Sequence, residues 1–202
     1  GVSAQLDAFA NGKSGMRPIA HLKDLRKPFL GGEVDSSNEE IRADLTNQKA
    51  ASEFTRAPLL ALTALEDLLS ESNFTANERA AFLNSTTVGG MDFSEHEFLY
   101  HGDKKNFSKF LNHSVGQSTR SISSYFGWKI YETSISTACS SSANTIMLGA
   151  RMILSGKYDQ VIAGGMESLS HFTINGFDSL MIYDSEHCRP YDETREGLNL
   201  GE

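Results

Sequence analysis

The sequence is poor in features that mark several classes of protein. It has only two cysteines in 202 residues, Cys139 and Cys188, too few for the disulfide framework of a secreted protein. It has no apolar run long enough to cross a membrane, and polar residues (Gln5, Asp7 and Asn11) interrupt its first apolar stretch. We therefore expect no membrane span and no signal peptide, and a reducing cytoplasm is the expected location.

Positive charge is also scarce. Lysine and arginine total 18 against 26 aspartates and glutamates, which gives a formal net charge of -8. This balance argues against non-specific binding to nucleic acid, which depends on a basic surface. HExxH and CxxC metal motifs are missing, as are P-loop and GxGxxG nucleotide motifs. The sequence thus predicts no metal site and no nucleotide cofactor.

The composition is that of an ordinary globular protein. Hydrophobic residues make up 39% and charged residues 22%, and the length suits one sizeable domain with its own core. Internal repeats and low-complexity linkers are not visible in the sequence.

The most informative stretch runs from residue 128 to residue 157. Residues 128–135 have the isoleucine, tyrosine and threonine content of a strand. Small residues then lead into a helix, whose apolar positions recur at steps of three and four: Ala143, Ile146, Met147, Ala150, Ile153 and Leu154. Gly156 and Lys157 end this helix. Cys139 therefore falls at or just before its first turn.

A cysteine at the start of a helix has favourable surroundings for nucleophilic chemistry. The first N–H groups lack partners within the helix, and the helix dipole adds positive charge, so a thiolate is stabilised. The same N–H groups can donate to an oxyanion when the sulfur attacks a carbonyl. Free cysteines are more commonly buried as small hydrophobes, and the residues alone leave both interpretations open.

Other segments complete an α/β pattern. Residues 81–88 are typical of a buried strand ending at Gly89 and Gly90, and residues 159–165 of a second strand after the cysteine helix. Strand, helix and strand in succession predict a βαβ unit with the cysteine at the carboxyl edge of a parallel sheet, where such folds place their sites. Further helices are expected near residues 2–12, 36–40, 57–69, 92–100 and 114–125.

Three sequence blocks, in the right order, resemble the β-ketoacyl-acyl carrier protein synthases, the condensing enzymes of the thiolase superfamily. They are the cysteine motif Thr137-Ala138-Cys139-Ser140-Ser141, the strand and turn Val161–Glu167, and a Gly-Phe and Arg-Pro-Tyr-Asp…Arg-x-Gly-x-x-x-Gly-Glu signature within residues 175–202. The resemblance covers nearly all of the chain but about half of the family's usual length. Residues 1–202 are accordingly expected to be an N-terminal ketosynthase domain, incomplete at both ends.

The resemblance implies a fold and a reaction. The fold is an α/β thiolase-like half-domain, with a mixed central sheet and helices on both faces, that normally packs against a second similar half. Cys139 would take an acyl group from the phosphopantetheine arm of an acyl carrier protein, and a decarboxylating malonyl unit would then extend it. No cofactor beyond that arm is implied. The family's two catalytic histidines and its second oxyanion donor come from the C-terminal half.

Two further residues match positions that bind substrate in the family. Val88 precedes the Gly-Gly turn near the far end of the acyl pocket, and Phe177 matches a phenylalanine that lines this pocket. A core valine and a loop aromatic packed on the core would look the same in the sequence. Arg189, Asp192 and Arg195 are expected to form a structural charge network, and Cys188 is expected to be structural.

The implied partners are an acyl carrier protein, a C-terminal half of the same fold, and a second synthase subunit in a homodimer or heterodimer. Carrier proteins are acidic, so docking on this acidic chain would need a local basic patch. Three alternatives stay open. The segment Gly164–Ser170 also resembles thiolases, which use coenzyme A thioesters. A non-catalytic chain-length factor would lack the nucleophile, so Cys139 counts against it, and the third alternative is a purely structural α/β domain.

Overall fold

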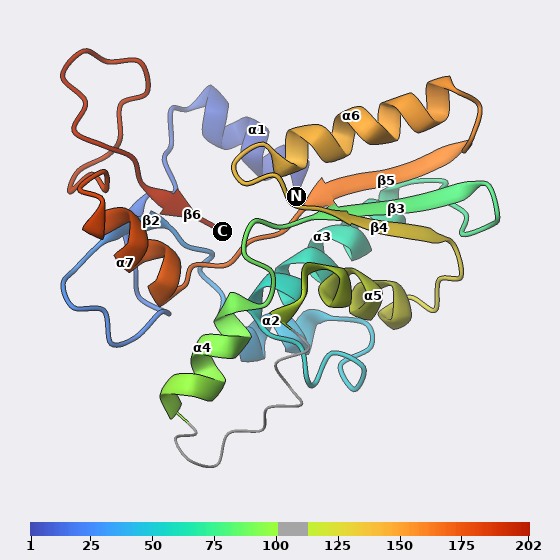
Figure 1. The fold of residues 1–202 in the computed structure, drawn as a ribbon, viewed down its shortest axis with the longest axis horizontal. Coiled ribbons are helices and arrows are strands. Elements are labelled where there is room, and N and C mark those ends of the chain that lie inside the picture. Colours follow the sequence, from blue (N-terminus) through green and yellow to red (C-terminus); the bar gives the residue numbers. More distant parts are fainter. Residues whose placement is uncertain (101–112) are drawn as a thin grey trace. The chain divides into compact units, whose positions relative to one another are not determined.

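The computed structural model describes residues 1–100 and 113–202 (Figure 1). The chain forms two compact units. The larger unit is continuous and comprises residues 38–167, whereas the smaller unit combines residues 1–37 with residues 168–202.

A parallel sheet lies at the centre of the larger unit. Its described strands are β3 (Ala80–Ser85), β4 (Tyr131–Ile135) and β5 (Gln160–Gly165), in the spatial order β4-β3-β5. The middle strand pairs Leu83 with Thr133 on one side and with Ala163 on the other, and each of its six residues is buried. The predicted strand–helix–strand unit is present, but β4 and β5 are separated by β3, so the connection between them crosses the middle strand.

Helices cover both faces of this sheet (Figure 1). Helix α6 (Ser141–Leu154) lies on one face, and α3 (Arg56–Glu71) and α5 (Val115–Tyr125) lie on the other. Side chains of β3 alternate accordingly: Phe82 packs in the core with Leu62 and Ile122, and Leu83 packs in a second cluster with Met152. Helix α2 (Asn38–Asp44) adds Ile41 to the first of these clusters. The predicted α/β architecture with helices on both faces is confirmed.

Helix α6 meets the sheet through three small residues and one methionine. Its buried positions are Ser141, Thr145, Gly149 and Met152. A Cβ atom on Gly149 would lie 3.1 Å from Val161 Cγ1, so the glycine permits the close approach of helix and strand.

The apolar positions that the periodicity of α6 singled out are all exposed. We call this set the α6 outer face: Ala143, Ile146, Met147, Ala150, Ile153 and Leu154. Ile146 is 58% exposed and Leu154 is 86% exposed. The helix is amphipathic as predicted, but its apolar stripe points away from the sheet.

The smaller unit contains a second sheet of short strands. Strand β2 (Leu30–Gly32) pairs antiparallel with β1 (Arg17–Pro18) and parallel with β6 (Leu200–Gly201). Parallel and antiparallel pairings thus both occur in the chain. Phe29, Leu169 and Ile174 form the core of this unit, together with helix α7 (His171–Ser179).

Other helices match or extend the expectations. Helix α1 (Val2–Ala10) and helix α4 (Met91–Tyr100) begin and end close to where they were expected. Ser114 is at the N-cap of α5 as predicted, although its side chain makes no capping hydrogen bond to the described residues. Helix α7 was not predicted, although the sequence holds its start signal, a capping box between Ser170 and Thr173. Within the described ranges, no helix is both long and apolar enough to cross a membrane.

The basic segment between β1 and β2 is organised by acids. The buried carboxylate of Glu33 accepts hydrogen bonds from the N–H groups of Ala20 (2.7 Å) and His21 (2.9 Å). Arg26 and Lys27 both form ion pairs with Asp178. Much of the positive charge of this segment is thereby neutralised within its own unit.

A buried acid, Asp92, lies in the first turn of α4. Both carboxylate oxygens of Asp92 are buried without a full hydrogen bond to the described residues. Burial raises the pKa of Asp92 above its usual 3.8. The Thr55 hydroxyl and nearby N–H groups, those of Arg56 and Ala57 among them, oppose this rise but do not cancel it.

We expect the Asp92→Asn variant to be more stable than the wild type at alkaline pH. Because folding favours the protonated carboxyl, its contribution to stability is full below about pH 3.8 and is lost as the pH rises through the raised pKa. Urea denaturation should show a higher free energy of unfolding for the variant at pH 8 and equal values for the two proteins near pH 4. The exposed Asp67→Asn on α3 is the control. An equal loss of stability at both pH values in D92N would contradict the prediction.

Candidate active site

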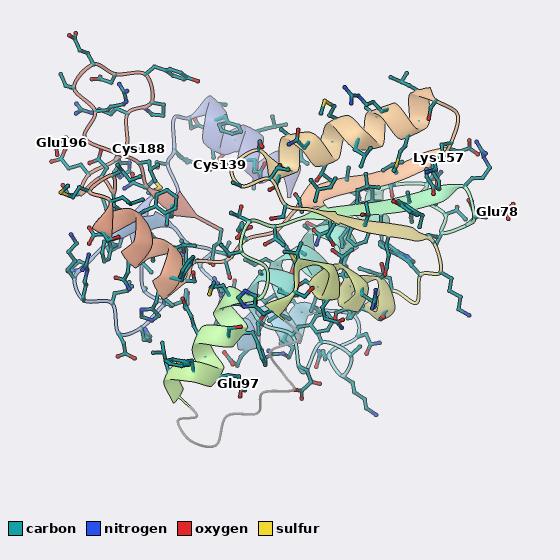
Figure 2. All side chains as sticks on the ribbon, in the orientation of Figure 1. Glu78, Glu97, Cys139, Lys157, Cys188 and Glu196 are labelled. Carbon is teal, nitrogen blue, oxygen red and sulfur yellow. The ribbon has the colours of Figure 1, made fainter. Side chains whose placement is uncertain are left out.

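The chain turns sharply between β4 and α6, and Cys139 lies in this elbow (Figure 2). Ser140 is the N-cap residue of α6, so the cysteine stands immediately before the helix, as predicted. Ala138 has a φ of 52°, in the left-handed region, at a cost of about 1 kcal/mol for a residue with a Cβ atom. The Cys139 side chain is exposed, which rules out the buried-hydrophobe alternative.

Small polar side chains hold the elbow in shape. The buried hydroxyl of Ser141 accepts from the N–H of Thr137 (2.8 Å) and donates to the carbonyl of Ala138 (2.6 Å). Asn144 Nδ2 donates to Thr137 Oγ1 (2.8 Å), and Ser140 Oγ donates to the Thr137 carbonyl (2.8 Å). These bonds offset the strain at Ala138. In the sequence the serines seemed only to leave room for a substrate, so this role was missed.

Two of the first N–H groups near the start of α6 are used within the elbow. The Ser140 N–H donates to the Thr137 carbonyl (3.4 Å), and the Ser141 N–H donates to the Ala138 carbonyl (3.0 Å). An oxyanion formed by attack of the sulfur would therefore take its hydrogen bonds from other N–H groups.

The start of α6 sits tightly against the ends of β3 and β5. Ser85 Oγ lies 3.2 Å from Ser142 Oγ and donates to the Gly164 carbonyl (3.0 Å). A Cβ atom on Gly165 would lie 2.4 Å from Ser142 Oγ and 2.5 Å from Ser85 Oγ. Glycine at 165 is thus required for the start of α6 to pack this closely against the sheet.

We expect Gly165→Ala to lower the free energy of unfolding by about 2 kcal/mol, because its Cβ must displace backbone or short side chains. Gly164→Ala is a matched control, since its Cβ would meet nothing within 4 Å. Urea denaturation should show a change within about 0.5 kcal/mol for this control. Equal effects of the two substitutions would contradict the packing argument.

The structure brings the loop that carries Val88 beside the cysteine elbow. Val88 is half-buried. The hydroxyl of its neighbour Thr87 donates to the Ala138 carbonyl, and the Thr87 carbonyl accepts from Ser136 Oγ, both at 3.5 Å. Phe177 is half-buried on α7 of the smaller unit, so it is a helix residue rather than a loop aromatic. Contact of either residue with a substrate stays a prediction.

Arg189, Asp192 and Arg195 make hydrogen bonds within the loop of residues 189–195, to Thr194 and to backbone carbonyls, and their role as a structural charge network stays a prediction. Asp192 Oδ1 accepts from the N–H and the hydroxyl of Thr194, both at 2.7 Å. These two bonds, and then the charge of Arg189, lower the pKa of Asp192. Arg189 Nη2 also donates to the Thr194 carbonyl (2.8 Å), and Arg195 Nη1 to the Asp192 carbonyl (2.9 Å).

The second cysteine has different surroundings. Cys188 is half-buried, and its N–H donates to Asn199 Oδ1 (2.8 Å). Across residues 1–100 and 113–202, no three His, Cys, Asp or Glu side chains are grouped so that they could hold a metal ion.

An exposed cysteine at a strand–helix elbow, on a parallel sheet covered on both faces, defines a thiolase-like α/β half-domain. The chain belongs to the beta-ketoacyl synthase family: residues 3–202 match the family model described as "Beta-ketoacyl synthase, N-terminal domain". The resemblance read from the three motif blocks is confirmed.

Individual relatives agree with this assignment. The chain is 28% identical to 3-oxoacyl-[acyl-carrier-protein] synthase 2 of Coxiella burnetii, with 100% of the chain and 52% of that protein covered. It is 26% identical to the enzyme of the same name from Staphylococcus aureus, with 86% of the chain and 46% of that protein covered. The chain thus spans about half the length of these curated relatives.

Solved structures show the same fold. A chain in the structure of the ketosynthase ApeO in complex with its chain length factor ApeC, from Xenorhabdus doucetiae, matches 92% of this chain over 47% of its own length, at a TM-score of 0.73 and 26% identity. The ishigamide ketosynthase/chain length factor matches 98% of the chain and 51% of its own at a TM-score of 0.81 and 20% identity.

Proposed function

We propose that the chain is the N-terminal half of a β-ketoacyl-acyl carrier protein synthase, acting in fatty acid or polyketide synthesis. The observation that carries the proposal is the exposed thiol of Cys139 at the start of α6, in a chain that belongs to this family. The reaction is acyl transfer followed by decarboxylative condensation. It needs no cofactor beyond the phosphopantetheine arm of the carrier protein, and we place it in a reducing cytoplasm.

The proposed mechanism has two covalent steps. The Cys139 sulfur attacks the carbonyl carbon of the acyl thioester, a new C–S bond forms, and the phosphopantetheine thiolate leaves and takes a proton. A malonyl unit then loses carbon dioxide, and its carbanion attacks the acyl-enzyme. A carbon–carbon bond forms, Cys139 leaves as thiolate, and a 3-oxoacyl thioester is released. Splitting the condensation in this way is covalent catalysis.

We further propose that the α6 outer face is covered by the second half of the fold. The six apolar residues of this face lie along one side of the helix, and exposure of such a continuous apolar surface to water is unfavourable. The relatives that the chain matches are about twice its length, so they have room for such a second half. That half would also supply the two histidines for decarboxylation and the second oxyanion donor.

The proposed partners are an acyl carrier protein and a second, identical or related, synthase subunit. Two of the structural neighbours are a ketosynthase with its chain length factor and a ketosynthase with its acyl-carrier protein. The thiolase alternative is not favoured, because the family match is to ketosynthases. The chain-length-factor alternative is disfavoured by the cysteine at position 139.

Incubation of the chain with acyl-acyl carrier protein or with acyl-coenzyme A tests the proposal. Intact-mass and peptide analysis should show one acyl group on Cys139, formed faster from the carrier protein. Faster acylation from coenzyme A would favour a thiolase. With a polypeptide that includes the second half, addition of malonyl-acyl carrier protein should release the 3-oxoacyl product. No acylation from either donor would overturn the proposal.

A further inference from the structure

A carboxylate just after β5 lies within the hydrogen-bond network at the carboxyl edge of the sheet. Glu167 Oε1 accepts from the hydroxyl of Thr86 (2.8 Å) and from the N–H of Thr87. Thr86 is only 2% exposed, and its Oγ1 also accepts from the N–H of Gly89 (3.0 Å). One carboxylate oxygen therefore organises the loop that follows β3, which we call the Val88 loop (residues 86–90).

At its other end, the Val88 loop contacts the backbone of His113. The Gly90 N–H donates to the His113 carbonyl (3.1 Å). Gly89 has a φ of 63°, and a Cβ atom there would lie 2.3 Å from the His113 oxygen. The loop is thus held between Glu167 and the residue that precedes α5 by two positions.

The Val88 loop is also the contact between the middle strand and the cysteine elbow. Its two hydrogen bonds to the elbow, between Thr87 and Ala138 and between Ser136 and Thr87, are both 3.5 Å long. Bonds at the limit of hydrogen-bond length are sensitive to small displacements of either partner. The position of the loop against the elbow therefore depends on what anchors the loop.

We propose that Glu167 is a positioning residue: it anchors the Val88 loop against the elbow and so fixes the placement of Val88 and of the Cys139 thiol. Its effect on acyl transfer rests on the proposed function, whereas its effect on the loop does not. Removal of the carboxylate leaves the buried Thr86 hydroxyl and the Thr87 N–H without their acceptor. The carboxylate acts through these two donors, without contact with the reacting atoms.

Amide hydrogen exchange of the full chain, followed by mass spectrometry, tests the anchoring. Glu167→Ala should speed exchange about tenfold in two segments, residues 86–90 and residues 136–140. Glu167→Gln keeps an acceptor oxygen and should restore near wild-type exchange. Glu78→Ala is the control, because Glu78 precedes the amino end of β3, at the end of the sheet away from Cys139 (Figure 2).

A second variant covers the case in which Glu167→Ala does not fold. Thr86→Val deletes the hydroxyl that links Glu167 to Gly89 and should speed exchange in the same two segments. Faster exchange in residues 86–90 alone, or an equal acceleration throughout β3 and β5, would overturn the proposal. So would a Gln variant as impaired as the Ala variant.

Acylation kinetics separate this inference from the proposed function. If Cys139 of the wild type is acylated, Glu167→Ala should lower the acylation kcat about tenfold and leave the KM for acyl-acyl carrier protein within about twofold. A changed KM with an unchanged kcat would overturn the positioning role. A wild type that is never acylated would overturn the proposed function, while the exchange measurements would still decide whether Glu167 anchors the loop.

Discussion

Replacement of Cys139 by alanine is expected to abolish acyl transfer to the polypeptide, with a loss of at least about a thousandfold. No other exposed thiol lies in the described part of the chain, and the elbow is held by side chains other than the cysteine. The thermal midpoint should therefore change by only about 1 °C or less. Mass spectrometry after incubation with acyl-acyl carrier protein measures the first effect, and differential scanning calorimetry measures the second.

The matched control is Cys188→Ala. This thiol is half-buried in the smaller unit, so its removal should leave acylation of Cys139 within about twofold of the wild type. If acylation persisted in C139A and disappeared in C188A, Cys188 would be the nucleophile and the assignment to Cys139 would be wrong. A serine at position 139 should be nearly as inactive as alanine, because a hydroxyl is a weak nucleophile without an adjacent base.

The second large effect is expected on the α6 outer face. Ile146→Asp places a charge in the middle of this apolar stripe. In the 202-residue chain the residue is 58% exposed, so the charge should reduce self-association and leave the fold intact. In a polypeptide that includes the proposed second half, the same charge would be buried without a partner and should destabilise the protein by about 3 kcal/mol or more.

Sedimentation velocity of the chain and urea denaturation of the longer polypeptide measure these two outcomes. Arg151→Glu is the control, since it changes charge on the flank of the same helix and should be tolerated in both. A Leu154→Asp variant repeats the test at the 86% exposed end of the face. If Ile146→Asp leaves the longer polypeptide fully stable, this face is not where the second half packs.

Much of the larger unit could be predicted from local sequence. The strand at residues 80–85 begins with four apolar residues, and the structure buries all six of its residues. The helix after Cys139 was identified by its apolar period, and its start could be placed within two residues. Family motifs then indicated the nucleophile, because the Thr-Ala-Cys-Ser-Ser segment occurs together with two other blocks in order.

The sequence could not show which face of α6 meets the sheet. Apolar period alone suggests burial, but the close contact with β5 is made at Gly149, and Met152 is the large apolar side chain of α6 that is buried against the sheet, whereas the six residues of the α6 outer face are exposed. Nor could it reveal the bonds that Glu167 makes to Thr86 and Thr87. Those residues are about 80 positions apart in sequence and meet only because β3 and β5 are neighbours.

The backbone conformation at Ala138 limits which amino acids can replace alanine at the position before the nucleophile. A left-handed φ of 52° is inexpensive only for glycine and, to a lesser degree, asparagine or aspartate. Glycine would loosen the turn, and the other two would set a polar or anionic group beside the sulfur. Alanine is the smallest side chain that restricts the backbone without adding charge, so the mutational tolerance of this position should be narrow.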